Sequence, residues 1–302
     1  MLRLLTHPDA DERATMEAWG GVECADVTDA DSAADACRRA HADGVERVVA
    51  VGGDGTVHLV VNGLMQLGAA ERPALCVLPM GTGNDLARTL GFDPDEAPST
   101  LVTRLRDVEL RPLDVLRAEA GGETRYIANA LTGGFSGLLH DALTDAQKAR
   151  WGPFAYLMSA VETLPDLEPY RVAVAWDGGP EEAMTVLNVA IANGRTAGGN
   201  GPVAPRASLE DGLVDVVLVR DASGPDLARL ATRALAAHGG GPDYLDDPLV
   251  VFNQVRSVRF ASEPGLPLIV DGEPWHDTPL QVTVEPGALR VGVGPDYRAE
   301  AG

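Results

Sequence analysis

Residues 48–56 read Val-Val-Ala-Val-Gly-Gly-Asp-Gly-Thr, and residues 75–85 read Leu-Cys-Val-Leu-Pro-Met-Gly-Thr-Gly-Asn-Asp. Each stretch joins a short apolar run, typical of a strand buried on both faces, to a turn rich in glycine and aspartate. Between them, residues 57–67 carry apolar side chains at helical spacing. Two consecutive strand–helix units place both turns at the carboxyl edge of one parallel sheet, where open α/β folds bind ligands. The sequence therefore predicts a nucleotide-phosphate site, since glycine lets backbone N–H groups approach an anion.

The same turns have a purely structural alternative. Tight turns use glycine for positive φ, and Asp54 and Asp85 would then only cap the helices that follow them. Two such turns after adjacent predicted strands, each with an acid at the start of a helix, favour the phosphate-binding interpretation. Aspartates in these positions can also hold a metal ion.

Lysine usage narrows the class of nucleotide site. Lys148 is the only lysine in the 302 residues. A Walker P-loop and a protein kinase each need a lysine on the phosphates at a fixed place, so both are excluded. Leu86 stands where the third glycine of a Rossmann dinucleotide motif belongs. Charge on a bound nucleotide must therefore be met by arginine, metal and backbone N–H groups.

Composition sets the expected surroundings of the protein. A formal charge of −21 argues against a nucleic-acid partner and against a broad electrostatic footprint on an anionic membrane. Cys24, Cys37 and Cys76 show no metal or disulfide spacing, which suits a reducing compartment. No apolar run approaches the roughly 20 residues of a membrane span. These features predict a cytoplasmic protein.

The pattern of predicted elements changes along the chain. Strands and helices alternate up to residue 114, including helices over 12–19 and 31–42, the latter capped by Asp31 or Ser32. From residue 115 to 294, strand-like runs separated by turn signals dominate, with helices near 154–164 and 225–237. We predict an α/β domain over 1–114, a β-rich sandwich or barrel over 115–294, and a tail, 295–302, packed back on the first domain. The glycine-rich residues 194–201 are either a functional loop or a loose connection.

Four stretches give the chain a resemblance to the diacylglycerol kinase catalytic family, which includes bacterial soluble diacylglycerol kinases and their phosphatidylglycerol- and sphingosine-phosphorylating relatives. The first stretch is shared with NAD kinases, whereas the second and the last are more specific to lipid kinases. Their order and spacing match the family over nearly the whole chain. The stretches are Gly52-Gly53-Asp54-Gly55-Thr56, Pro79-Met80-Gly81-Thr82-Gly83-Asn84-Asp85-Leu86-Ala87-Arg88, Asp211-Gly212-Leu213-Val214-Asp215 and Asp271-Gly272-Glu273.

The resemblance implies an ATP- and Mg²⁺-dependent lipid kinase that phosphorylates the hydroxyl of a lipid such as diacylglycerol, with its active site in the cleft between an α/β domain and a β-rich domain. Glu273 would be the general base, and Arg88 would be tied to an acidic network one helical turn after Asp85. That network around the catalytic magnesium would be Asp54, Asp85 and Asp114. The ATP site would be Thr28, Gly52, Gly53, Asp54, Gly55, Thr56, Gly81, Thr82 and Asn84. A second, structural magnesium would be held by Asp211 and the carbonyls of Ser208 and Leu213.

General chemistry agrees with these implied roles to differing degrees. Phosphoryl transfer depends on positioning and charge neutralisation, so a lysine-poor enzyme can use magnesium held by carboxylates. A carboxylate within hydrogen-bond reach can accept the proton of a lipid hydroxyl. On spacing alone, however, residues 271–273 would be an ordinary hairpin turn, and residues 211–215 a polar loop that leads into a strand.

The chain departs from the family pattern at two places. Thr6-His7-Pro8-Asp9 stands where the family has Asn-Pro and a glycine-rich turn, and His58-Leu59 replaces Asn-Glu. Because a carboxylate is lost at residue 59, nucleotide contacts are expected to be weaker or rearranged. The acidic residues and the implied base are intact, which favours an active enzyme.

The acceptor is the least determined part of the prediction. Residues 152–161 carry few charges and either border a pocket for acyl chains or pack into the core. His140, His238 and His276 are predicted at the surface or in loops. Two alternatives stay open: an NAD kinase-like phosphotransferase on a soluble acceptor, and a non-catalytic nucleotide- or lipid-binding protein. The expected partner is a lipid substrate met transiently at the inner membrane face, with a homodimer left open and no nucleic acid.

Overall fold

The computed structural model describes residues 2–6, 23–134, 169–238, 243–275 and 279–299. The predicted helices over 12–19 and near 154–164 lie outside these residues, as do the first-strand departure at residues 7–9, the apolar segment 152–161, Lys148, His140 and His276. The side chain of His238 is also outside the described set. Those predictions therefore stay untested.

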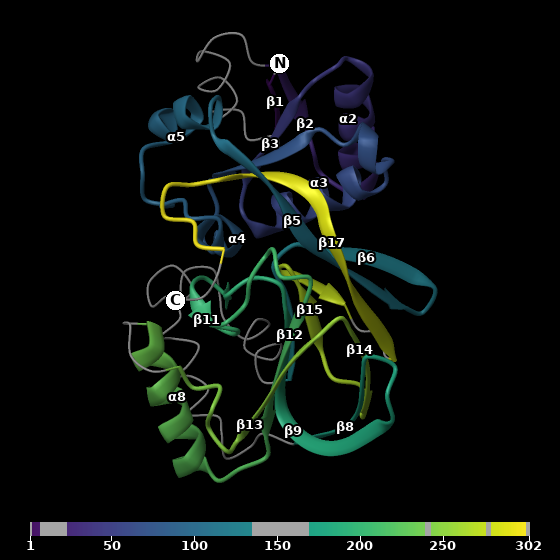
Figure 1. Ribbon diagram of the computed structural model, residues 1–302, viewed down its shortest axis with the longest axis vertical. Helices are drawn as coiled ribbons and strands as arrows, with labels where there is room; N and C mark the ends of the chain where they lie inside the picture. The colour runs from purple at the N-terminus through teal and green to yellow at the C-terminus, as the bar shows by residue number, and fades with distance from the viewer. Residues whose placement is uncertain (1, 7–22, 135–168, 239–242, 276–278, 300–302) are drawn as a thin grey trace.

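The first part of the chain forms a parallel sheet covered by helices, and we call it the α/β part (Figure 1). Its strands lie in the order β2-β1-β3-β4 and are all parallel. The residues of β3 and β4 are buried almost throughout, as their unbroken apolar runs predicted. The elements are β1 (Leu2–Thr6), β2 (Glu23–Asp26), α2 (Ala30–Ala42), β3 (Arg47–Gly52), α3 (Asp54–Met65), η1 (Ala69–Glu71), β4 (Ala74–Pro79), α4 (Asp85–Thr89) and α5 (Pro98–Leu105).

The cap of α2 corrects one prediction. The N-cap residue is Asp29, whose carboxylate accepts the N–H of Ser32 at 2.8 Å, so neither Asp31 nor Ser32 begins the helix. The hydroxyl of Ser32 in turn accepts the N–H of Asp29 at 3.0 Å. This reciprocal capping box places Ser32 at the third helical position, inside the first turn of a helix that begins at Ala30.

The β-rich part is predominantly antiparallel and contains two apolar cores. Side chains of β7, β8, β9, β12 and β14 contribute to the larger core, and α8 covers the smaller one (Figure 1). The elements are β6 (Glu123–Ile127), β7 (Ala130–Gly134), β8 (Tyr170–Trp176), β9 (Glu181–Ala192), β10 (Thr196–Ala197), β11 (Gly201–Pro202), β12 (Val214–Arg220), α8 (Gly224–His238), β13 (Val250–Val255), β14 (Ser257–Glu263), β15 (Leu268–Val270) and β16 (Glu273–Trp275).

Two long strands run through both parts. Strands β5 (Glu109–Ala120) and β17 (Leu280–Val293) pair antiparallel along their length, and Val291 of β17 also pairs in parallel with Leu75 of β4. In Figure 1, β17 crosses from the lower to the upper part of the molecule. The two parts therefore share one continuous sheet, and the predicted boundary at residue 114 falls inside β5.

The long strands also correct the sequence prediction. The sequence predicts two separate strands over 280–284 and 289–292, because Glu285-Pro286-Gly287 between them has turn composition. They form one strand, with a register shift between Glu285 and Leu289 where β17 bulges away from β5. The sequence also predicts a single strand over 125–130, whereas the structure divides these residues between β6 and β7. No strand is predicted from the sequence at the position of β13.

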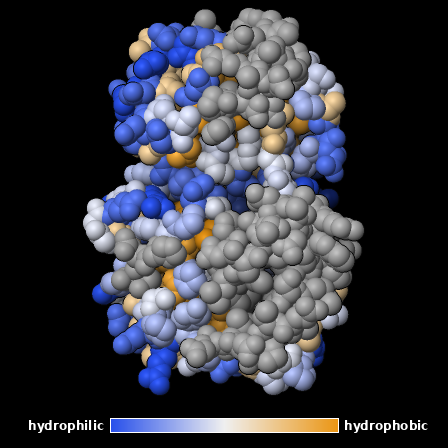
Figure 2. Space-filling view, turned by 180° about the vertical axis from the view of Figure 1, so that it is seen from behind, coloured by the Kyte–Doolittle hydropathy of each residue, from blue (hydrophilic) through white to orange (hydrophobic). Residues whose placement is uncertain are grey.

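With these corrections, the predicted fold class is confirmed: an α/β part is followed by a β-rich part. The face seen in Figure 2 has hydrophilic residues at the narrow waist between the upper and lower halves. Within the part of the chain that the structure describes, no helix combines the length and the apolar character needed to cross a membrane.

Candidate active site

The two glycine-rich turns, residues 52–56 and 81–85, lie in contact with each other. A Cβ on Gly81 would lie 2.3 Å from the Cα of Gly53, so glycine is required for the turns to pack this closely. The N–H of Met80 donates to the carbonyl of Gly52 at 3.0 Å, and Asn84 exchanges hydrogen bonds with Gly81. The structure therefore brings the two turns together at one sheet edge.

Asp54 and Asp85 each lie in the first turn of a helix, α3 and α4 respectively, and they meet there. The N–H of Asp85 donates to Oδ1 of Asp54 at 2.9 Å, and neither aspartate is the capping residue of its helix. Burial, together with the negative charge of Asp85, raises the pKa of Asp54 to about 7. A raised pKa means that the ionised form of Asp54 is disfavoured. A divalent cation beside the two carboxylates would stabilise their ionised forms.

The glycine-rich segment left open by the sequence forms a small hairpin that contacts Asp85. Strands β10 and β11 pair around it, and the N–H groups of Gly199 and Asn200 donate to the two oxygens of Asp85 at 2.8 and 2.6 Å. Asp85 is 4 % exposed. These contacts join the β-rich part directly to the acidic pair, a role for residues 194–201 that the sequence left undecided.

Glu273 approaches the same place from the β-rich part. It begins β16, is exposed, and has its Oε1 within 2.9 Å of the position that a Cβ on Gly55 would take. Gly55 follows Asp54 in the first turn of α3. The carboxylate of Glu273 therefore lies over the start of the helix that carries Asp54, as an acceptor for a substrate proton would need to.

Asp114 occupies a different environment from Asp54 and Asp85. Its two oxygens accept the N–H groups of Gly212 and Gly287 at 2.7 and 2.8 Å, and its pKa is raised by burial. It is near Asp211, whose pKa is raised by burial and by the charge of Asp114. Among the described residues, Asp114 makes no hydrogen bond with the pair at the glycine turns. Its membership of their magnesium network stays a prediction.

Neither Arg88 nor Thr28 makes a hydrogen bond with the side chains of the acidic pair among the described residues. The Nε of Arg88 donates to the carbonyl of Gly83 at 3.4 Å, and the described residues contain no ion pair between Arg88 and either Asp54 or Asp85. Thr28 is exposed beside the start of α2, where its N–H donates to the hydroxyl of Ser32 at 2.9 Å. The structure thus brings together only some of the predicted site residues.

The segment proposed for a second cation is compact and partly buried. The N–H of Leu213 donates to Oδ1 of Asp211 at 3.0 Å, and the N–H of Glu210 donates to the hydroxyl of Ser208 at 3.2 Å. The raised pKa of Asp211 is compatible with a cation at its carboxylate. Within the described ranges, however, no group of three or more His, Cys, Asp or Glu side chains is arranged to hold a metal ion. Carbonyl and water oxygens would have to complete either site.

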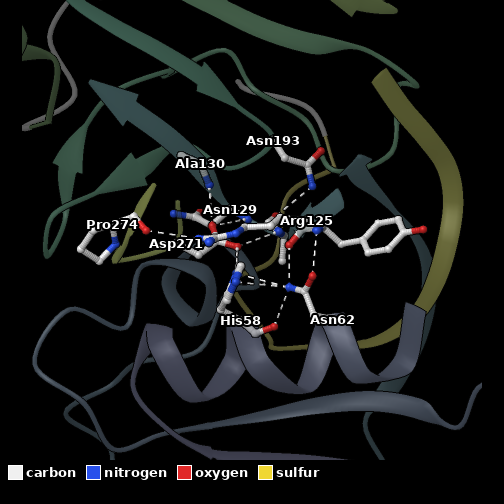
Figure 3. A network of polar contacts seen from close by, with 10 residues as sticks. His58, Asn62, Arg125, Asn129, Ala130, Asn193, Asp271 and Pro274 are labelled. Atoms are coloured by element: carbon white, nitrogen blue, oxygen red, sulfur yellow. Dashed lines mark hydrogen bonds and ion pairs between the residues drawn. The ribbon is translucent and has the colours of Figure 1, made fainter. Parts of the chain in front are cut away.

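Sequence reasoning missed a polar network next to Glu273 (Figure 3). Its centre is Asp271, which was quoted in a motif but given no role, and His58, which was noted only as a departure from a pattern. Asn62 of α3 joins them: its Nδ2 donates to the carbonyl of Tyr126 at 2.9 Å, and its Oδ1 accepts the N–H of Tyr126 at 2.8 Å. Asn129 and Asn193 also take part, and no spacing in the sequence singles them out.

Comparison with known proteins identifies the family of the chain. Residues 11–118 match the family described as the diacylglycerol kinase catalytic domain, and residues 132–293 match the YegS C-terminal NAD kinase beta sandwich-like domain. The chain belongs to the diacylglycerol kinase family. The resemblance stated from the sequence motifs is thereby confirmed, and the chain is a member of a family of lipid kinases.

Individual relatives extend over most of the chain. A protein of Chromohalobacter salexigens named "Probable lipid kinase YegS-like" is 34% identical over 255 residues, which are 83% of this chain and 77% of the relative. The diacylglycerol kinase of Bacillus subtilis is 32% identical over 228 residues, 75% of this chain and 70% of that protein. The crystal structure of a diacylglycerol kinase from Bacillus anthracis superposes with a TM-score of 0.71 at 21% identity, covering 98% of both chains, which shows the shared fold.

Proposed function

We propose that this family member transfers the γ-phosphoryl group of ATP to the hydroxyl of a membrane lipid such as diacylglycerol, in a Mg²⁺-dependent reaction. The observation that carries the proposal is the position of Glu273 over Gly55, beside the Asp54–Asp85 pair. In this proposal, Glu273 of the β-rich part is the proton acceptor, the carboxylate pair of the α/β part attracts a cation, and the glycine turns beside them bind phosphate. Family membership and the lipid kinase names of the relatives support the choice of a lipid acceptor.

In the proposed reaction, the lipid hydroxyl oxygen forms a bond to the γ-phosphorus as the bond to the β,γ-bridging oxygen of ATP breaks and ADP leaves. The hydroxyl proton passes to the carboxylate of Glu273. The turns at Gly53 and Gly81 bring backbone close to the phosphates. Asp54, next to Asp85, and Asp211 would hold magnesium ions, and magnesium when bound neutralises phosphate charge.

The direct test is incubation of the purified protein with ATP labelled at the γ-phosphate, Mg²⁺ and vesicles that contain diacylglycerol, phosphatidylglycerol or a sphingoid base. Phosphorylated lipid is the expected product. Labelling of soluble acceptors such as NAD alone, or ATP binding without transfer to any acceptor, would instead support the two alternative functions. In either case the lipid kinase proposal would be rejected.

The role of Glu273 is tested by Glu273→Gln, which keeps the shape of the side chain and removes its ability to accept a proton. We expect kcat to fall at least 100-fold, since general acid–base catalysis contributes about 10²–10⁴-fold. Glu182→Gln is the matched control, because Glu182 is also an exposed glutamate on a strand, in β9. Wild-type activity in Glu273→Gln would exclude Glu273 as the base.

A further inference from the structure

The turn that carries Glu273 has an unusual backbone. Strands β15 and β16 pair through Val270 and Glu273, so Asp271 and Gly272 are the two turn residues. Their φ angles are 45° and 94°, and two successive positive values are typical of a type I′ hairpin turn. Glycine adopts this conformation freely and aspartate tolerates it, so the sequence Asp-Gly suits this turn.

The carboxylate of Asp271 is bound by three successive backbone N–H groups. Oδ1 accepts the N–H groups of Asn129 and Ala130 at 3.1 and 2.9 Å, and Oδ2 accepts that of Ala128 at 3.0 Å. The N–H of Asp271 in turn donates to the carbonyl of Ala130 at 3.0 Å. Asp271 is only 7 % exposed, so these bonds form largely out of water and fix the turn against the junction of β6 and β7.

The same carboxylate also reaches the α/β part. Nδ1 of His58 on α3 lies 3.4 Å from Oδ2 of Asp271, and Asn62, one turn along α3, is hydrogen-bonded to Tyr126 of β6. Figure 3 shows His58 and Asn62 pointing from α3 toward Asp271 and the β6–β7 junction. The hairpin, the β6–β7 junction and α3 are thereby held at one point, two residues from Glu273.

The side chain of Glu273 makes few contacts with the described residues. Its side chain is exposed, and the described residues give it no hydrogen bond or ion pair. Among the described residues, the backbone of the hairpin is what holds Glu273 over Gly55. On the far side of that hairpin, Arg125 donates to the carbonyl of Pro274 at 3.2 Å and lies over the ring of Trp275. On the side of the hairpin that faces the β6–β7 junction, the buried carboxylate of Asp271 binds the N–H groups of residues 128–130.

We propose that Asp271 is a positioning residue: its buried carboxylate, bound by the amides of residues 128–130 and by His58, fixes the hairpin so that Glu273 lies over the first turn of α3. This inference rests on the proposed function, in which Glu273 accepts the substrate proton. Its distinctive consequence is that loss of the carboxylate reduces turnover by way of Glu273, beyond any effect on stability.

The chain contains a matched control for this role. Asp177 also has a positive φ, 49°, and is followed by Gly178 in the connection between β8 and β9. Its Oδ1 accepts two successive backbone N–H groups, those of Arg256 and Ser257, at 2.8 and 2.9 Å. Asp177 is exposed whereas Asp271 is buried, but it has the same Asp-Gly turn and the same kind of backbone N–H contacts, with no general-base candidate two residues later.

The test compares Asp271→Asn with Asp177→Asn, because an amide nitrogen cannot accept the N–H groups that the lost oxygen bound. We expect both variants to melt at lower temperature, whereas only Asp271→Asn lowers kcat, by 10- to 100-fold, with KM for ATP within about twofold of wild type. A kcat for Asp271→Asn within twofold of that for Asp177→Asn would overturn the proposal.

The double variant Asp271→Asn/Glu273→Gln separates this inference from the proposed function. If Asp271 acts through Glu273, the double variant has the kcat of Glu273→Gln alone, because the positioned group is already lost. A further tenfold fall would assign Asp271 another role and overturn the inference. A fully active Glu273→Gln would reject the base itself, whereas an inactive Glu273→Gln beside a fully active Asp271→Asn would reject only the positioning role.

A second pair keeps the proposal testable if Asp271→Asn does not fold. Gly272→Ala and Gly178→Ala both place a Cβ at positive φ, 94° and 73°, with no atom within 4 Å of it. Both variants should melt at a lower temperature than wild type because of backbone strain at positive φ. Only Gly272→Ala is expected to lower kcat, by about tenfold, because only its turn carries Glu273. Wild-type kcat in Gly272→Ala would overturn the proposal.

Discussion

Asp54 and Asp215 are both aspartates whose pKa is raised to about 7, chiefly by burial and also by the charge of a second aspartate. Asp54 begins a helix beside the glycine turns, with Glu273 over the next residue. Asp215 lies within β12 between paired strands and is completely buried. We expect a raised pKa to indicate a functional carboxylate only where a substrate or cation can reach it, and therefore at Asp54 and not at Asp215.

The largest expected difference is in activity. Asp54→Asn should lower kcat at least 100-fold, because the acidic pair loses the charge that would attract a cation to the phosphates. Asp215→Asn should keep kcat within about threefold of wild type, since its side chain is enclosed in the sheet. Lipid phosphorylation assays on both variants check this. Equal losses of activity would show that the two carboxylates do not differ in function.

A smaller loss of kcat is expected when the Asp54 carboxylate is moved by a neighbouring substitution and Asp54 itself is kept. A Cβ on Gly83 would lie 2.4 Å from Oδ2 of Asp54, so Gly83→Ala must move that carboxylate. We expect kcat to fall about tenfold, since misplacing a reacting group by about 1 Å can cost up to 10²-fold. Gly179→Ala in the β8–β9 connection, where the Cβ would lie 3.0 Å from the Trp176 carbonyl, is the control and should stay fully active.

The dependence of folding stability on pH tests the raised pKa that Asp54 and Asp215 have in common. Each carboxyl keeps its proton in the folded state up to about pH 7 but loses it near pH 3.8 when unfolded. The folded state therefore binds more protons in this interval, and stability should fall as pH rises from about 4 to 7 and then level off. Thermal unfolding of the ligand-free protein from pH 4.5 to 8 measures this. A rise in melting temperature over that range would contradict the assigned pKa shifts.

The smallest expected effect concerns the stability of single variants. Asp215→Asn removes a buried carboxyl whose ionisation at high pH destabilises the folded state. Part of the gain in stability is offset, because Oδ2 of Asp215 has no hydrogen-bond partner among the described residues, and the new amide would have none there either. We expect a net gain of about 1 kcal/mol at pH 8, measured by denaturant unfolding. The gain should be smaller at pH 4.5, because that pH lies close to the unfolded pKa of 3.8 and the protonation difference between the folded and unfolded states has by then cost less stability. The same gain at both pH values would exclude ionisation as its cause.

Local sequence patterns were sufficient to predict the sheet edge that carries the site. The runs at 48–51 and 75–79 are apolar throughout because both faces of β3 and β4 are covered. The glycines at 53 and 81 reflect close backbone contact, which composition alone suggested. By contrast, Pro286-Gly287 looks like a turn and is a bulge, because pairing with β5 continues on both sides of it.

The contacts that assemble the site are between residues far apart in the chain, which explains why they were not predicted. The amides that bind Asp85 are 114 and 115 residues away, and those that bind Asp271 are 141 to 143 residues away. Backbone amides are provided by almost every residue type, so such pairs leave no sequence signal. The sequence motifs contained Asp85 and Asp271, but they did not indicate which backbone amides bind these side chains.

The shared ribbon of β5 and β17 has a consequence for how the protein unfolds. Eleven residue pairs join the two strands, and together they reach from the β-rich part to the parallel sheet. Beyond β17 the chain is fixed again, since the N–H of Gly294 donates to the carbonyl of Leu90 at 2.7 Å. A cut after residue 114 would divide β5 and leave β17 without part of its partner in either fragment. The α/β part and the β-rich part should therefore melt as one cooperative unit, and neither half is suited to expression alone.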